Sequence, residues 1–85
     1  MRVYSLLFAD KAQKQLSKLP KSYASRIIDK IESITDDPHR YVEGCEGYPY
    51  FHQRIGDYRV ILDLNDTDRV IEVLKIGPRK NVYDR

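Results

Sequence analysis

Alternating apolar and polar positions in the second half of the chain predict two β-strands joined by a tight turn. Residues 50–59 read Tyr-Phe-His-Gln-Arg-Ile-Gly-Asp-Tyr-Arg, with Gly56-Asp57 between two runs that favour strands. A glycine at this place is typical of a two-residue hairpin turn, because it adopts the positive backbone angle that such turns require. The turn predicts a register in which Arg54 pairs with Arg59.

This register sorts the two strands into an apolar face and a basic face, because directly paired residues share a face. One face is predicted to form the core, with Gln53 as its polar exception, and its other members are Phe51, Ile55, Tyr58, Val60 and Leu62. The opposite face carries Tyr50, His52, Arg54, Arg59 and Asp63. Like charges that lie opposite each other repel. We therefore expect an anionic group between Arg54 and Arg59.

The first half of the chain predicts one strand and two helices. Residues 2–8 favour a strand with Tyr4, Leu6 and Phe8 on one face. Helix formers follow, with Asp10 as the expected cap and Pro20 as the stop. Ser22 is the expected cap of the second helix, and residues 36–38 (Asp-Asp-Pro) are expected to end it. Its apolar stripe has helical spacing and consists of Ala24, Ile27, Ile28, Ile31 and Ile34.

The rest of the chain predicts a loop and a meander of strands. The expected segments are a loop at 39–49, strands at 50–55, 58–64 and 69–76, a turn at 65–68, and a polar tail at 79–85, with Gly77-Pro78 ending the last strand. The predicted fold is α+β, in the order β-α-α-β-β-β. We expect the helical hairpin to pack on one face of a small, mainly antiparallel sheet, which leaves the other face open.

Length and composition limit the possible classes of protein. A chain of 85 residues fits one domain, at 1–85. The net charge is only +2, so a basic surface has to come from clustering. A single cysteine, Cys45, excludes an internal disulfide and fits a reducing cytoplasm. Apolar runs are too short to span a bilayer. His39, His52 and Cys45 are too scattered to predict a metal site.

Candidate chemistry therefore falls on the face that the helices leave open. Arginine is a planar, permanently charged fork suited to phosphate. Tyrosine can stack on a base or exchange a proton. The candidates are His52, Arg54, Arg59, the corner at 77–80 and Tyr83. For Arg59 the structural alternative is an ion pair with Asp57 or Asp63, and Tyr83 could simply pack the tail on the sheet.

Several segments together resemble one protein family. They are the early strand followed by Ala12, Leu16 and Leu19-Pro20, the isoleucine-rich second helix that ends at Asp37-Pro38, the turn at 56–59 (Gly-Asp-Tyr-Arg), and 76–83 (Ile-Gly-Pro-Arg-Lys-Asn-Val-Tyr). In this order and spacing they resemble the RelE/ParE superfamily of bacterial and archaeal toxin–antitoxin systems. The chain looks most like the RelE branch, and the resemblance covers essentially its whole length.

The resemblance implies an endoribonuclease that enters the ribosomal A site and cuts mRNA by attack of a 2′-hydroxyl on the adjacent phosphate, without a metal or cofactor. It assigns stabilisation of the pentacoordinate phosphate to Arg59, phosphate contact and leaving-group assistance to Arg79, and stacking or orientation of the nucleotide to Tyr83. RNA binding would fall to Arg54, His52 and Lys80. The general base stays open, because arginine is a poor base near neutral pH and His52 is chemically better suited.

The resemblance leaves two other functions open, a ParE-like inhibitor of gyrase without RNase activity and an inactive relative that only binds an antitoxin. It also implies partners: the ribosome, mRNA, and a RelB-like antitoxin in a hetero-oligomeric complex. The C-terminal segment of that antitoxin would cover the cations at Arg54, Arg59 and Arg79.

Overall fold

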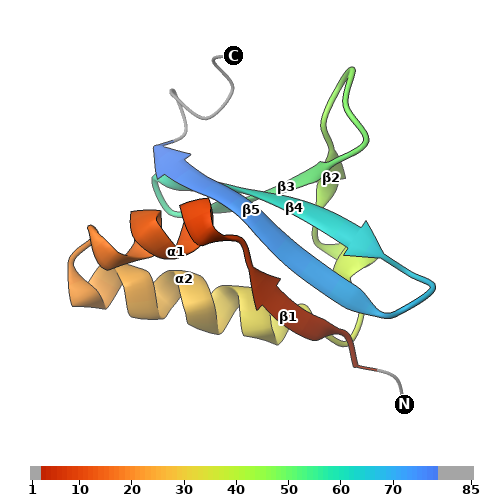
Figure 1. Ribbon diagram of the computed structural model, residues 1–85, viewed down its shortest axis with the longest axis horizontal. Helices are drawn as coiled ribbons and strands as arrows, with labels where there is room; N and C mark the ends of the chain where they lie inside the picture. Colours follow the sequence, from red (N-terminus) through yellow and green to blue (C-terminus); the bar gives the residue numbers. More distant parts are fainter. Residues whose placement is uncertain (1–2, 79–85) are drawn as a thin grey trace.

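The computed structural model describes residues 3–78, which form a five-stranded sheet with two helices packed on one of its faces (Figure 1). The elements are β1 (Ser5–Phe8), α1 (Asp10–Ser17), α2 (Lys21–Ser33), a 3-10 turn η1 (Pro38–Arg40), β2 (Glu43–Gly44), β3 (Phe51–Ile55), β4 (Tyr58–Asn65) and β5 (Val70–Pro78). The predicted α+β class and the helical hairpin on one face of the sheet are confirmed. No helix among these residues is long and apolar enough to cross a membrane.

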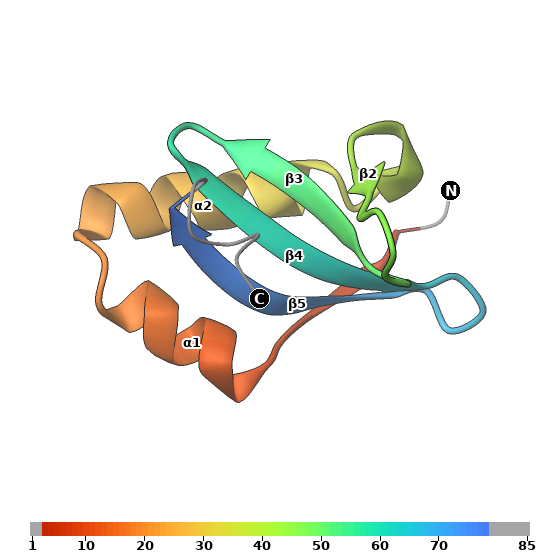
Figure 2. The same ribbon diagram turned by 90° about the horizontal axis from the view of Figure 1, so that it is seen from above.

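The strands lie in the order β1-β5-β4-β3-β2, and only the β1–β5 pair is parallel. Looking down on the sheet, β3, β4 and β5 run side by side in front of the helices (Figure 2). The first strand therefore lies next to the last, with Ser5 opposite Val70. This pairing joins the first strand of the chain to the beginning of the last.

The β3–β4 hairpin has the register that the turn residues predict. Ile55 pairs with Tyr58, and Arg54 pairs with Arg59. Gly56 has a φ of 60°, the positive angle that a glycine at the first turn position supplies. The turn thus fixes which side chains face the helices and which face away.

Both expected helix caps are wrong, the first (Asp10) by one residue and the second (Ser22) by two. The N-cap positions are Ala9 and Pro20, and neither makes a side-chain cap hydrogen bond. Asp10 is instead the first residue of α1, where its negative charge favours the helix N-terminus. Proline fits the second N-cap because its ring restricts φ to values near the −55° observed there, while its ψ of 146° is that of an extended residue before the helix.

The segment expected as a loop contains η1 and the two-residue strand β2, so that expectation is wrong in part. The expected end of the last strand at Gly77 is also wrong, since β5 continues to Pro78. A proline is tolerated there because β1 reaches only as far as Val73 on β5, so no strand needs the missing N–H on that side.

The core lies between α2 and the sheet. Ile27, Ile31 and Ile34 from the predicted helical stripe are at most 2% exposed, and they pack against Val60 and other fully buried strand residues. A β-bulge between Ile61 and Leu62 shifts the pairing with β5. This shift brings the side chains of both Val73 and Ile76 into the core, although the two residues are three positions apart.

Polar contacts join the N-terminal strand to the β4–β5 turn. The Tyr4 hydroxyl donates to Asp66 Oδ1 at 2.7 Å, and His39 Nε2 lies 2.8 Å from the same oxygen. The hydrogen bond from Tyr4, followed by that from His39, lowers the pKa of the Asp66 carboxyl below its ordinary value. Arg69, with a positive φ of 59°, lies over the Tyr4 ring at 5.7 Å. These contacts hold β1 in place beside β5.

Replacing Leu62 by alanine should destabilise the protein strongly, because Leu62 is fully buried under the helices. We expect a loss of about 3 kcal/mol or more in the free energy of unfolding, from lost burial plus the cavity left behind. Urea denaturation measures it. Leu7→Ala is the matched control, since Leu7 is 55% exposed and should change stability by about 0.5 kcal/mol or less. Equal losses in the two variants would contradict this placement of the core.

Candidate phosphate site on the β3–β4 hairpin

Two arginines lie opposite each other on the sheet face that points away from the helices. Arg54 on β3 pairs with Arg59 on β4, next to the core residues Ile55 and Val60 that point the other way. Arg54 is exposed, whereas Arg59 is only 5% exposed. Burial of Arg59 on the face expected to be open was not foreseen. A buried guanidinium is retained only where surrounding groups hold it, so Arg59 is a fixed cation rather than a flexible one.

His52 lies beside this pair and is also buried, with 9% exposure. Its Nε2 lies 3.2 Å from Glu43 Oε1, and its Nδ1 lies 3.7 Å from the Cys45 sulfur. Both partners come from β2 and the residue after it, because Glu43 pairs with His52 across the strands. The two ring nitrogens therefore point to different side chains, which fixes the orientation of the ring rather than assembling a metal site.

The electrostatic environment keeps His52 neutral. Burial is the main cause that lowers the pKa of His52 below its ordinary value, and the charge of Arg59 lowers it further. Glu43 acts in the opposite direction and raises it. Burial also raises the pKa of the Cys45 thiol, which Arg59 partly offsets. The site thus combines two permanent cations with a neutral imidazole and a neutral thiol.

Sequence reasoning found three of these residues and missed two. His52, Arg54 and Arg59 were predicted, and the structure brings them together. Glu43 and Cys45 were not assigned a role, because the two-residue strand that carries them to His52 has no recognisable strand pattern. The remaining predicted residues, Arg79, Lys80 and Tyr83, lie outside residues 3–78.

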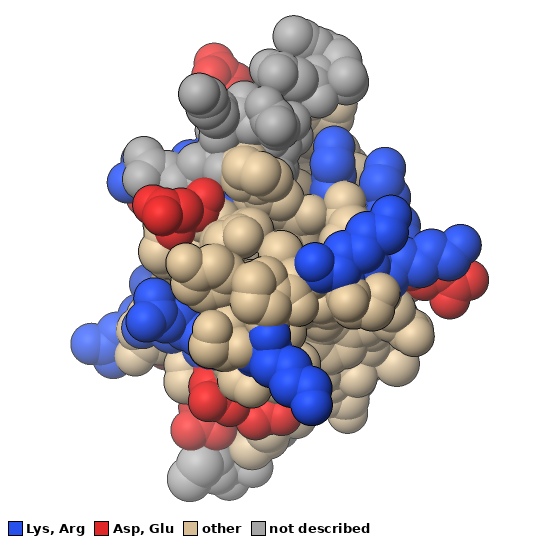
Figure 3. Space-filling model, turned by 90° about the vertical axis from the view of Figure 1, so that its left-hand side faces the viewer, with Lys and Arg blue, Asp and Glu red and all other residues tan. Residues whose placement is uncertain are grey.

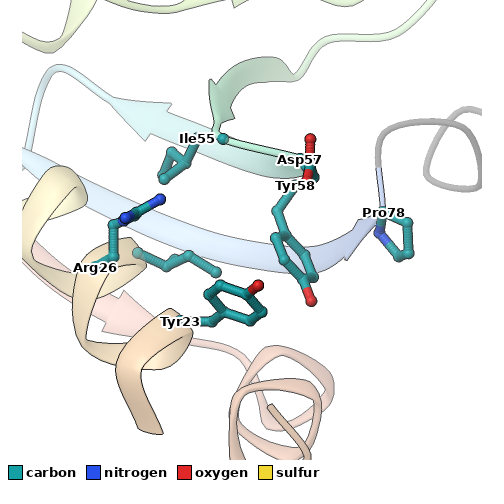
Figure 4. Close-up of a pocket in the computed structure, with 8 residues that line it drawn as sticks. Tyr23, Arg26, Ile55, Asp57, Tyr58 and Pro78 are labelled. Carbon is teal, nitrogen blue, oxygen red and sulfur yellow. The ribbon is translucent and has the colours of Figure 1, made fainter. Parts of the chain in front are cut away.

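A separate pocket of about 460 Å³ opens at the hairpin turn, between α2 and the end of β5 (Figure 4). Tyr23 and Tyr58 face each other across it with ring centroids 5.8 Å apart, and Arg26 points toward Ile55. On the side of the molecule at the left of Figure 1, basic side chains flank a strip of uncharged residues (Figure 3). Cations are thus gathered at several places despite the small net charge.

Comparison with protein families identifies the chain. Residues 6–83 match the model of the ParE toxin of type II toxin–antitoxin systems, parDE. The chain belongs to the RelE/ParE superfamily of toxins. The predicted resemblance is thereby confirmed at the level of the superfamily. No curated protein matches the chain.

Solved toxin structures have the same fold. A chain of the archaeal RelE–RelB complex from Pyrococcus horikoshii is 31% identical, with a TM-score of 0.74 over 91% of this chain and 96% of that one. A chain of the RelBE2 toxin–antitoxin complex from Mycobacterium tuberculosis is 23% identical, with a TM-score of 0.83 over 93% of this chain and 94% of that one. A chain of the intact RelBE toxin–antitoxin complex from E. coli is 21% identical, with a TM-score of 0.77 over 88% of this chain and 95% of that one.

The pKa of His52 should respond to its charged neighbours in opposite directions. Glu43→Gln should lower it further by removing the nearby carboxylate, whereas Arg54→Gln should raise it by removing a cation. NMR titration of the imidazole protons measures both pKa changes, and His39→Gln identifies which of the two histidine signals is His52.

Because folding disfavours protonation of His52, the free energy of unfolding should also fall as the pH drops below about 6.5. If the pKa of His52 has its ordinary value in the wild type and in every variant, the proposed effect of burial and of these charges is wrong.

Proposed function

We propose that this toxin is a ribosome-dependent endoribonuclease that cuts mRNA in the A site and so inhibits translation in the cytoplasm. The observation that carries the proposal is the cross-strand pair of Arg54 and Arg59 beside a neutral His52. Two facing guanidinium groups repel each other unless an anion lies between them. An RNA phosphate is such an anion, and it is the reacting group in RNA cleavage.

The chemistry would follow from these charges. The ribose 2′-oxygen attacks the adjacent phosphorus, the bond from phosphorus to the 5′-oxygen breaks, and the strand ends in a cyclic phosphate. Negative charge builds up on the phosphoryl oxygens in the transition state. Arg59 would stabilise that charge, and because it is already fixed by burial, little reorganisation is needed at the moment of reaction.

Two proton transfers accompany the reaction. With the proton of the neutral imidazole on Nε2, facing Glu43, Nδ1 is the nitrogen that would accept the proton of the 2′-hydroxyl, and the substrate would take the place of its 3.7 Å contact with Cys45. The lowered pKa of His52 favours this neutral form near neutral pH. The leaving 5′-oxygen needs stabilisation or a proton, and we assign that to Arg79, with Tyr83 stacking on the nucleotide. Arg54 and Lys80 would bind the RNA backbone. No step requires a metal.

Arg59→Ala and Arg79→Ala should each lower mRNA cleavage about 100-fold or more, because each removes a donor to the transition-state charge. Primer extension on mRNA from translating ribosomes, with purified toxin added, measures the cut ends. Arg26→Ala is the matched control, since it removes an exposed arginine on the helix side of the sheet. Circular dichroism verifies that each variant is folded. Undiminished cleavage by folded Arg59→Ala and Arg79→Ala proteins would overturn the site assignment.

A second function is favoured by the matching family model itself, which describes a ParE toxin. Inhibition of gyrase would use the fold as a binding module and would not need the Arg59 site. Brief induction in cells separates the two functions. New mRNA ends without DNA damage support the RNase, whereas DNA damage with intact mRNA supports gyrase inhibition. Growth without either effect would identify an inactive relative.

The toxin should also bind a small antitoxin, in keeping with its similarity to the RelE–RelB complex. We expect an extended, acidic antitoxin segment to cover Arg54 and Arg59, because clustered cations attract and orient such a segment. Co-purification of the natively expressed toxin should recover a hetero-oligomer, and Arg54→Glu should weaken it more than Arg26→Glu. Recovery of the toxin only as a free monomer would contradict this partner.

A further inference from the structure

A second polar pocket, here called the edge pocket, lies at the outer edge of β3. Its volume of about 370 Å³ is within the range of small-molecule sites, about 300–1,000 Å³. It is lined by Lys30, Tyr41, Glu43, His52, Gln53 and Arg54. These residues come from α2, from β3, and from β2 with the residues before it. The pocket therefore exists only in the folded chain.

The edge pocket forms because β2 covers only the beginning of β3. Within residues 3–78, β2 pairs with β3 at Glu43–His52 and Gly44–Phe51 and at no further position. Tyr41 is not part of the sheet and does not pair with Arg54. The second half of β3 thus borders open space next to α2.

The buried end of the edge pocket contains a polar group that needs a hydrogen bond. Gln53 is only 6% exposed, and its Oε1 has no hydrogen-bond partner among the described residues. A buried acceptor left in this way lowers stability. Gln53 is the polar member of an otherwise apolar face of the hairpin. Because this oxygen is itself buried, the Gln53 amide has to turn toward the pocket before an N–H donor of a ligand can satisfy it.

The outer part of the edge pocket combines cations with an aromatic ring. Lys30 and Arg54 are both exposed, and Tyr41 is 52% exposed. Glu43 also lines the pocket, and its Oε1 lies 3.2 Å from His52 Nε2, so its carboxylate is engaged with the imidazole. Arg40 lies over the Tyr41 ring at 5.8 Å from its centroid, so a base would stack on the opposite face of the ring. A ring beside two cations suits a base attached to a phosphate, since aromatic stacking and phosphate pairing are the usual means of binding single-stranded nucleic acid.

We propose that the edge pocket binds one nucleotide of single-stranded RNA. The base stacks on Tyr41 and donates an N–H to Gln53 Oε1, and the phosphate lies between Lys30 and Arg54. This inference rests on the proposed function and extends it, because Arg54 lies across from Arg59. A strand whose reacting phosphate is at Arg59 would pass over Arg54 into the pocket. An acidic peptide would use the cations, whereas a nucleotide would use both the cations and the flat face of the ring, so RNA is the better fit.

Nucleotide binding can be measured on the isolated full-length toxin by following its backbone amide signals in NMR. The probes are AMP, ribose 5-phosphate, which lacks the base, and adenosine, which lacks the phosphate. AMP should shift the signals of residues around Tyr41 and Gln53, and each of the other two probes should bind more weakly. Because none of the probes has a cleavable linkage, the result does not depend on RNase activity.

Matched variants locate the binding. Tyr41→Leu should raise the Kd for AMP about fivefold or more, from lost stacking. Tyr41→Phe and Tyr48→Leu are the controls, since one keeps the ring and the other removes a different exposed tyrosine. Gln53→Leu should raise the Kd about threefold or more by removing the acceptor. The same change should raise the midpoint of thermal unfolding, because an unsatisfied buried oxygen is replaced by an apolar group. If Gln53 had only a structural role, Gln53→Leu would instead lower the midpoint of thermal unfolding.

The outcomes separate the edge pocket from the proposed RNase. Equal AMP binding by Tyr41→Leu and Tyr48→Leu overturns the nucleotide pocket, even if Arg59→Ala still abolishes mRNA cleavage. AMP binding at the edge pocket without any mRNA cleavage by the wild type overturns the RNase and leaves the binding site standing. If Tyr41→Leu and Gln53→Leu bind AMP normally but lose the antitoxin, the occupant is the antitoxin and the proposal is wrong.

Discussion

The register of the β3–β4 hairpin determines both the core and the basic site. Gly56, with its φ of 60°, closes the turn so that Ile55 lies opposite Tyr58 and Arg54 lies opposite Arg59. A slip of one residue would exchange the two faces of a strand, because successive side chains point to opposite sides. Arg59 would then point toward the isoleucines of α2, and Val60 would point away. Burial of the apolar face therefore also holds the two arginines on the opposite one.

Burial of Arg59 fixes the position of one positive charge in the site. An exposed arginine is a flexible, hydrated charge, whereas Arg59, a residue only 5% exposed, is held in one place by its surroundings. The neighbouring imidazole of His52 stays neutral in part because Arg59 is so near. The arrangement concentrates positive charge at one point without adding a third cation. This concentration of charge is the basis for proposing that the site binds a phosphate of mRNA or the carboxylates of an antitoxin.

The short strand β2 has more influence than its two residues suggest. It brings Glu43 and Cys45 to the two nitrogens of His52, and its early end leaves the outer edge of β3 uncovered next to α2. The phosphate site and the edge pocket are consequently neighbours that share Arg54. Among residues 3–78, no helix packs on the second face of the sheet and no strand pairs with the outer edge of the second half of β3, so these are the two surfaces that the proposals use. The proposed RNase site uses the first and the proposed nucleotide pocket uses the second.

The sequence by itself determined the features that depend on local geometry or on a repeating pattern. The Gly-Asp dipeptide specified the turn and its register, the isoleucine spacing specified the buried stripe of α2, and the order of motifs specified the superfamily. Helix caps and the end of β5 were misplaced by a residue or more, because Ala9 and Pro78 lie where neighbouring structure allows them, and the fixed φ of Pro20 suits the cap position better than the hydroxyl of Ser22 does. The burial of Arg59, the contacts of His52 and the unsatisfied oxygen of Gln53 were decided only in the tertiary structure. Each depends on segments far apart in the chain, and no local pattern encodes how closely they approach.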